Sequence, residues 1–195
     1  MRIISGKYKK RVLISPKDKS IRPTSDRQRE SLFNILTSMN SIATARVLDL
    51  FAGTGALGIE ALSRGARSIV FVDNSRKAIG LIENNIKNLQ IEDLTEVIQC
   101  NIIKSLSCLD HYVFDLILMD PPYHHSYINK TLIHIINQKC FDENTIIVAE
   151  HAASESIQIP EQIKELDHRK YGNTMFRFFK VRFLLDSVYY DIPEK

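Results

Sequence analysis

The chain has 195 residues and a formal net charge of +3, with 44% hydrophobic and 25% charged residues. This length is enough for one domain with a full hydrophobic core, and the composition is typical of globular proteins. No apolar run reaches the roughly 18–20 residues that a membrane-spanning helix needs. The first seven residues lack the apolar stretch of a secretory signal, so we expect no membrane contact.

Three cysteines, Cys100, Cys108 and Cys140, have neither an even count nor the Cys-x-x-Cys spacing of a zinc site. The pattern argues against a disulfide framework and is typical of reduced thiols in a cytoplasmic protein. We therefore expect a cytoplasmic protein that contains no metal. Separately, we expect it to be a monomer.

Positive charge is concentrated at the start of the chain. Residues 1–30 contain ten lysines and arginines against three acids, a net charge of +7, whereas the rest has 16 basic and 20 acidic groups, or −4. A basic segment on a mildly acidic body is typical of a protein that binds a polyanion. A solvated basic arm without a partner is the alternative. The residues expected to contact nucleic acid are Arg2, Lys7, Lys9, Lys10, Arg11 and Arg29.

In chain order, residues 2–14 alternate loosely around Ser5-Gly6-Lys7 and predict a short β-hairpin or irregular extension. Pro16 and Pro23 indicate a loop over residues 15–25. Ser25 stands three residues before Gln28, which is the spacing of a capping box, so a helix is expected over residues 26–39.

From residue 46 onward, apolar strand patterns alternate with helical ones. Strands are expected over residues 47–51, 68–73, 96–99, 115–119 and 145–149. Helices are expected over residues 56–64 and 75–89, from about residue 102 for a short distance, and over 127–138. Strict alternation predicts a doubly wound, mostly parallel α/β sheet. Residues 165–171 and 174–183 flank Gly172-Asn173 and predict a closing antiparallel hairpin.

A glycine-rich turn follows the first of these strands. In the segment from Asp49 to Gly58, Gly53 and Gly55 permit a tight turn and close ligand approach, and Gly58 permits close packing of helix on strand. A Gly-x-Gly-x-x-Gly match also fits a dinucleotide site. However, Asp49 precedes the glycines, where it would repel a pyrophosphate and attract a cation.

Asp73 ends the second strand 20 residues after Gly53, which suits contact with ribose hydroxyls. An acid on each side of the turn favours a ligand with a ribose and a positive charge, and S-adenosylmethionine has both. The alternative for Asp49 is a structural acid that caps the next turn. Asn101 follows the third strand and is a candidate for the adenine edge, with Ile102 packing on the ring; Asn101 equally suits a helix N-cap. Phe51 either packs near the cofactor or fills the core.

The segment Asp120-Pro121-Pro122-Tyr123 ends the fourth strand. Two prolines fix two φ angles and remove two backbone donors, so the carbonyls around them have no ladder partner. A carboxylate and a carbonyl can then accept hydrogen bonds from a planar amino group while Tyr123 stacks on its ring. This pattern predicts methylation of an exocyclic or amide nitrogen at these four residues, and a simple strand-ending turn is the alternative.

With these motifs, the chain resembles class I S-adenosylmethionine-dependent methyltransferases and, more narrowly, the RsmD family of 16S rRNA guanine-N2 methyltransferases. The resemblance covers nearly the whole chain. The glycine loop and the proline corner are shared by many methyltransferases, whereas the block from Arg22 to Asn34 is specific. Ser5 stands where the family often has a second glycine, residues 157–169 match weakly, and the tail after Phe183 does not match.

The resemblance implies a single Rossmann-like methyltransferase domain over residues 1–195, with a seven-stranded sheet whose last strand is antiparallel. It implies a basic extension and helix over residues 1–40, a cofactor-binding catalytic core over 41–183 and a tail over 184–195. The substrate would be one guanine of small-subunit rRNA, free or in the assembling 30S subunit. Arg22, Thr24, Arg27 and Glu30 would lie over the cofactor and target; an ordinary capped amphipathic helix is the alternative for that block.

Under this interpretation Asp120 orients the guanine amine rather than removing its proton. His124, His125 and His151 are candidate proton relays, and exposed loop histidines are the simpler interpretation. Three rival functions remain at this point: a DNA adenine or cytosine amino-methyltransferase, a protein-glutamine methyltransferase, and a non-catalytic RNA-binding assembly factor with the same fold.

Overall fold

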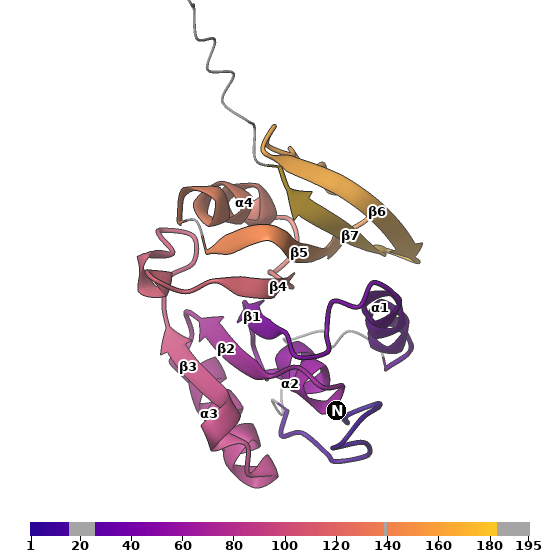
Figure 1. Cartoon of the computed structure of the whole chain (residues 1–195), viewed down its shortest axis with the longest axis vertical. Coiled ribbons are helices and arrows are strands. Elements are labelled where there is room, and N and C mark those ends of the chain that lie inside the picture. Colours follow the sequence, from indigo (N-terminus) through magenta and orange to yellow (C-terminus); the bar gives the residue numbers. More distant parts are fainter. Residues whose placement is uncertain (16–25, 139, 183–195) are drawn as a thin grey trace, which may run out of the picture.

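A seven-stranded sheet forms the centre of the protein, in the order β3-β2-β1-β4-β5-β7-β6 (Figure 1). The computed structural model describes residues 1–15, 26–138 and 140–182. Strands β1 to β5 are parallel, and β7 runs antiparallel to both β5 and β6. This arrangement confirms the expected sheet. The strands are β1 (Arg46–Leu50), β2 (Ser68–Asp73), β3 (Thr95–Gln99), β4 (Phe114–Met119), β5 (Phe141–Ala152), β6 (Ile163–Tyr171) and β7 (Thr174–Val181).

Helices cover both faces of the sheet (Figure 1). Apolar residues of α1 (Asp26–Ser38), α2 (Ala56–Ser63) and α3 (Arg76–Leu89) form one core cluster with the first face. Residues of α4 (Tyr127–Gln138) and of the segment before β4 form a second cluster with the opposite face. Because both faces are covered, the central strands are apolar almost throughout, as the sequence of β4 illustrates.

One expected helix is absent. After β3 the described chain makes a single turn, in which the Ser105 N–H donates to the Asn101 carbonyl at 3.2 Å, and then a 3₁₀ turn at Ser107–Leu109. The Ser105 hydroxyl accepts from the Ser107 N–H at 3.0 Å. Such side-chain bonds compete with helix continuation, and the expectation of a helix from residue 102 was wrong.

The N-terminal extension lies along α2. Arg2 and Val12 form an antiparallel bridge, which agrees with the expected hairpin-like segment. The buried Glu60 carboxylate accepts from the N–H groups of Ile4 at 2.8 Å and Ser5 at 3.1 Å. Near the other end of the extension, the Ile14 N–H donates to Asn85 at 2.7 Å, and Asn85 in turn donates to the Thr54 carbonyl of the glycine loop at 2.9 Å.

Gly6 lies tightly against the C-terminal end of α2. Its φ is +81°, and a Cβ added there would lie 1.7 Å from the carbonyl oxygen of Ser63, the last residue of α2. Only glycine fits this approach. The extension is therefore a fixed part of the fold that joins the C-terminal end of α2 to the glycine loop.

Candidate active site

The main cavity, of about 780 Å³, opens at the carboxyl ends of the central parallel strands. This is where open α/β sheets bind their ligands. The glycine loop after β1, the acid that ends β2, the turn after β3 and the proline corner after β4 all contribute to its wall. The lining includes Phe51, Gly53, Asp73, Asn101, Ile102, Asp120, Pro121, Pro122 and Tyr123, all of them predicted site residues.

The glycine loop has the geometry that the sequence predicts. Gly53 and Gly55 have φ values of +57° and +77°, and Phe51 also has a positive φ, +60°. A Cβ at Gly58 would lie 2.4 Å from a ring carbon of Phe71, so the first turn of α2 packs directly on β2. A non-glycine residue with positive φ is strained, and such strain is concentrated at ligand sites.

Asp73 braces this loop from the neighbouring strand. One carboxylate oxygen accepts from the Gly53 N–H at 2.9 Å and the other accepts from the Ser75 N–H at 2.8 Å. The side chain also lines the cavity. Each carboxylate oxygen has two lone pairs, so Asp73 can hold the loop and accept hydrogen bonds from ligand hydroxyls.

Asp49 lies beneath the loop. Its carboxylate is 1% exposed and accepts from the Gly58 N–H at 2.9 Å, and Asp49 is not among the described residues that line the cavity. Burial raises the pKa of the Asp49 carboxyl to about 8, and the nearby Asp73 charge adds to the rise. This position fits the alternative that Asp49 is a structural acid capping the next turn. Any effect on a cationic ligand would then be indirect, through the glycine loop.

Aromatic and apolar groups also line the cavity beside the glycine loop. The ring of Phe51 stacks parallel to that of Tyr127 with centroids 6.1 Å apart, so Phe51 is both a cavity residue and a support for the second core cluster. Ile102 is 2% exposed beside Asn101. The Asn101 amide oxygen accepts from the Lys104 N–H at 3.3 Å. Asn101 therefore caps a single turn and not the expected helix, and it also lines the cavity.

The proline corner forms another part of the cavity wall. Asp120 and Tyr123 face the cavity together with the prolines between them. The Tyr123 hydroxyl donates to the Glu150 carboxylate at 3.0 Å and lies 3.3 Å from the Thr174 hydroxyl. Burial and the charges of Glu150 and Asp120 raise the pKa of Tyr123, so its hydroxyl stays protonated at neutral pH.

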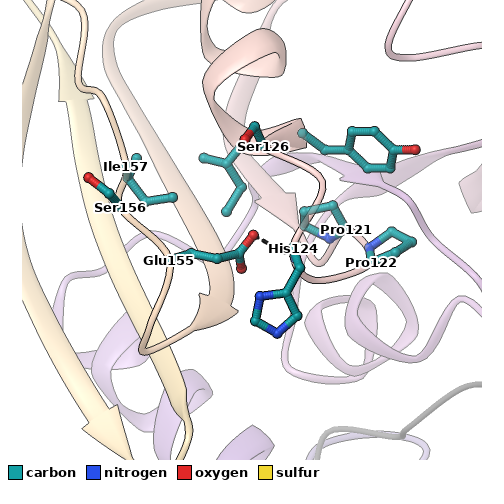
Figure 2. Close-up of a pocket in the computed structure, with 9 residues that line it drawn as sticks. Pro121, Pro122, His124, Ser126, Glu155, Ser156 and Ile157 are labelled. Atoms are coloured by element: carbon teal, nitrogen blue, oxygen red, sulfur yellow. Dashed lines mark hydrogen bonds between the residues drawn. The ribbon is translucent and has the colours of Figure 1, made fainter.

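A second cavity, of about 320 Å³, shares Pro121, Pro122 and Tyr127 with the first (Figure 2). Glu155, from the segment after β5, joins its two walls. One carboxylate oxygen of Glu155 accepts from the His124 N–H at 2.7 Å and the other from the Ala152 N–H at 3.0 Å. The loop after the corner has positive φ at His124 and Ser126. Glu155 therefore fixes a strained loop that carries the proline corner.

Other predicted residues lie elsewhere. Arg22, Thr24 and the Ser25 cap fall outside the described residues, as does the tail after residue 182. Arg27 and Glu30 are exposed on α1 and do not line the main cavity, whereas Gln28 does. His124 and His125 are exposed. His151 was expected in an exposed loop, but it is 1% exposed in β5, accepts from Arg177 at 3.2 Å, and has a pKa lowered by burial.

The basic residues divide into two groups. Arg2, Lys7, Lys9, Lys10 and Arg11 are exposed on the extension. Arg29 is 1% exposed, and its guanidinium donates to the Arg2 carbonyl at 2.6 Å and to Asp26 at 3.1 Å. Arg29 is buried on the same helix as Leu32, Phe33 and Leu36, so it ties the helix to the extension and is not presented to a polyanion.

Eight further cavity residues were missed by the sequence reasoning: Gln28, Asn74, Ser75, Ile103, Lys104, Tyr127, Glu150 and Thr174. Glu150 had one usable signal, because it continues a predicted parallel strand just as Asp120 does. Gln28, Tyr127 and Thr174 lie at the starts of elements whose placement depends on the tertiary fold.

The cavity fits S-adenosylmethionine. It has room for a nucleoside and a second planar group, with a carboxylate at Asp73, an amide at Asn101 and an apolar side chain at Ile102 on one side of the proline corner. Within the described ranges, no group of three or more histidines, cysteines or acids is placed to hold a metal ion, and no helix is long and apolar enough to cross a membrane.

A family model described as "Conserved hypothetical protein 95" matches residues 1–180. YlbH of Bacillus subtilis is 36% identical over 187 residues, which cover 93% of this chain and all of YlbH. Ribosomal RNA small subunit methyltransferase D of Buchnera aphidicola is 36% identical over 159 residues, 82% of each chain. The solved structure of Escherichia coli yhhF superposes with a TM-score of 0.82 at 27% identity and covers 93% of this chain and 98% of its own.

The family model spans most of the chain, and the relatives match it over most of their own length. The chain therefore belongs to the conserved hypothetical protein 95 family, which is the RsmD family that its motifs resemble.

Proposed function

We propose that this protein transfers a methyl group from S-adenosylmethionine to the exocyclic N2 of one guanine in small-subunit rRNA. One observation carries the proposal: the acid-braced glycine loop and the Asp120 to Tyr123 corner line the same cavity. Under this proposal the donor and the acceptor would occupy the same cavity. The relatives named ribosomal RNA small subunit methyltransferase D support rRNA as the acceptor.

The donor would be held by residues of the loop and its neighbours. Asp73 would accept hydrogen bonds from ribose hydroxyls, Asn101 would contact the adenine edge, and Ile102 and Phe51 would pack on its apolar surfaces. When bound, S-adenosylmethionine supplies a methyl group already activated by its sulfonium charge. The protein then has only to position the acceptor. The acceptor nitrogen must lie within about 3–3.5 Å of the methyl carbon and in line with the sulfur–methyl bond that breaks.

The proline corner would provide that position. An exocyclic guanine amine is a poor nucleophile because its lone pair is delocalised into the ring. Accepting its N–H bonds at the Asp120 carboxylate and the Pro121 carbonyl fixes its direction and shifts electron density onto nitrogen. Tyr123 would stack on the base. The amine becomes acidic as it is methylated, so a strong general base is not required.

Access to the cavity requires the guanine to leave its stack. The exposed cations of the extension, Arg2, Lys7, Lys9, Lys10 and Arg11, would hold surrounding phosphates. Such contacts give salt-dependent affinity and orientation but little sequence information. The extension suits this role because Glu60 and Asn85 hold its backbone on α2 and α3.

The proposal is tested by incubating the purified chain with tritiated S-adenosylmethionine and small-subunit rRNA from a strain that lacks the gene. Label is expected in N2-methylguanosine after digestion to nucleosides. Total DNA and protein from the same strain serve as parallel acceptors. Label in N6-methyladenosine, a methylated cytosine or a glutamine side chain would instead support a rival amino-methyltransferase, and absence of transfer would support a binding-only assembly factor.

A further inference from the structure

Two acids lie side by side at the carboxyl ends of β4 and β5, where they line the main cavity. Strands β4 and β5 are parallel, and Met119 of β4 is paired in register with Ala149 of β5. The next residue of each chain segment is an acid, Asp120 after Met119 and Glu150 after Ala149. Both line the cavity with Tyr123, and Glu150 is 4% exposed.

Neighbouring carboxylates select a ligand edge with several adjacent N–H donors, because an ionised carboxylate only accepts hydrogen bonds. Guanine has such an edge, with the N1–H beside the exocyclic 2-amino group. Adenine and cytosine instead present one amino group beside an unprotonated ring nitrogen, which is itself an acceptor. An acceptor facing that nitrogen would leave both groups unsatisfied and repelling each other.

We propose that Glu150 accepts the guanine N1–H while Asp120 orients the 2-amino group, and that Glu150 thereby selects guanine over adenine and cytosine. This inference rests on the proposed function and adds the residue that reads the base.

Glu150 has a second role that the test must separate. Its Oε1 accepts from the Tyr123 hydroxyl at 3.0 Å, so Glu150 also orients the ring proposed to stack on the base. Tyr123→Phe removes that hydrogen bond and keeps the Glu150 carboxylate. If Glu150 acted only through Tyr123, Tyr123→Phe and Glu150→Gln would change kcat and KM in the same way.

The experiment uses a small-subunit rRNA fragment in which the methylated guanine, once located, is replaced by 2-aminopurine. This analogue keeps the 2-amino group and has an unprotonated N1. Methyl transfer to both RNAs is measured for the wild type, Glu150→Gln, Glu150→Asp and Tyr123→Phe, with circular dichroism to confirm that each variant is folded.

For the wild type we expect kcat/KM on guanine to exceed that on 2-aminopurine by at least about 100-fold. Glu150→Gln should reduce this ratio to about tenfold or less, because the amide can donate to the unprotonated N1. Tyr123→Phe should lower kcat/KM on both RNAs and leave their ratio unchanged. Glu150→Asp should also leave the ratio unchanged and should lower the two values less.

The inference is overturned if the wild type accepts both RNAs equally, or if Glu150→Gln keeps the wild-type ratio. Because 2-aminopurine also lacks the 6-oxo group of guanine, the wild-type comparison can overturn the inference by itself, whereas the change of the ratio in Glu150→Gln assigns the discrimination to Glu150. Failure of the proposed function has a different signature, since the wild type would then methylate neither the guanine RNA nor its analogue.

Discussion

The Asp73 carboxylate at the end of β2 accepts a hydrogen bond from the Gly53 N–H at 2.9 Å, so β2 braces the glycine loop that follows the neighbouring strand β1. Asp73 also faces the main cavity. One side chain thus holds the glycine loop and, in the proposed function, also accepts hydrogen bonds from the ribose hydroxyls.

Asp73→Ala should weaken S-adenosylmethionine binding by about 10- to 100-fold, because it removes an acceptor for the ribose hydroxyls and loosens the loop; one charge-assisted hydrogen bond contributes about 1.5–3 kcal/mol. Isothermal titration calorimetry measures the effect. Asp93→Ala, an exposed acid in the 3₁₀ turn before β3, is the matched control and should bind normally. Unchanged affinity in Asp73→Ala would remove this residue from the site.

Reversing the charges of Lys9 and Lys10 should weaken rRNA binding and flatten its salt dependence. Both side chains are exposed on the extension, and each phosphate contact contributes about 0.7–0.9 to the slope of log K against log salt. Binding is measured at several salt concentrations by filter retention or fluorescence anisotropy. The control reverses Lys164 and Lys170, which are exposed on the edge strand β6. A slope that does not change at Lys9 and Lys10 rejects the extension as the phosphate-binding surface.

Gly6→Ala should destabilise the docked extension. The substitution places a Cβ 1.7 Å from the Ser63 carbonyl oxygen and adds strain at a φ of +81°. Gly172→Ala is the matched control, because Gly172 has a φ of +61° but nothing within 4 Å of its Cβ position. Urea denaturation should show a loss of about 1–3 kcal/mol for strain alone in the control and a larger loss for Gly6→Ala. Equal losses would mean that the close approach of Gly6 to α2 contributes nothing.

The buried Asp49 should make stability depend on pH. Its pKa is raised from 3.8 to about 8 in the folded protein, so between these values the folded state binds more protons than the unfolded state. The free energy of unfolding should therefore fall as the pH rises from about 4 to about 8, by at most about 1.4 kcal/mol per pH unit, and level off above that.

Asp49→Asn keeps an acceptor for the Gly58 N–H but does not titrate. Urea denaturation from pH 5 to pH 9 should thus show the wild type losing stability relative to this variant as the pH rises. Parallel curves for the two proteins would show that the Asp49 carboxyl is ionised across the range despite its burial.

Much of the fold could be predicted because its signals are local. The apolar run ending at Met119 and the Gly172-Asn173 turn each specify an element from adjacent residues, and β4 and the β6–β7 hairpin form as expected. The prediction of a short helix after Asn101 was wrong because the Ser105 hydroxyl accepts from the nearby Ser107 N–H, a bond that hydrophobic periodicity does not register.

Site residues could be predicted where they end or directly follow a strand. They could not be predicted where burial or strand register in the tertiary fold determines their position. Asp73 and Asp120 end strands and line the cavity as expected. Arg29 and His151 look like surface groups in the sequence, but packing buries both. Arg29 donates to the Arg2 carbonyl while its Nε finds no hydrogen-bond partner among the described residues, and His151 accepts from Arg177. Glu150 enters the cavity because β5 pairs in register with β4, and register between distant strands is not visible in either strand alone.

The most direct test of the account compares the wild type with Asp120→Ala in methyl transfer to small-subunit rRNA lacking the modification. The account predicts N2-methylguanosine from the wild type, a rate at least about 100-fold lower from Asp120→Ala, and S-adenosylmethionine affinity within about twofold of wild type in the variant. Normal turnover by Asp120→Ala, or a wild-type product other than N2-methylguanosine, would contradict it.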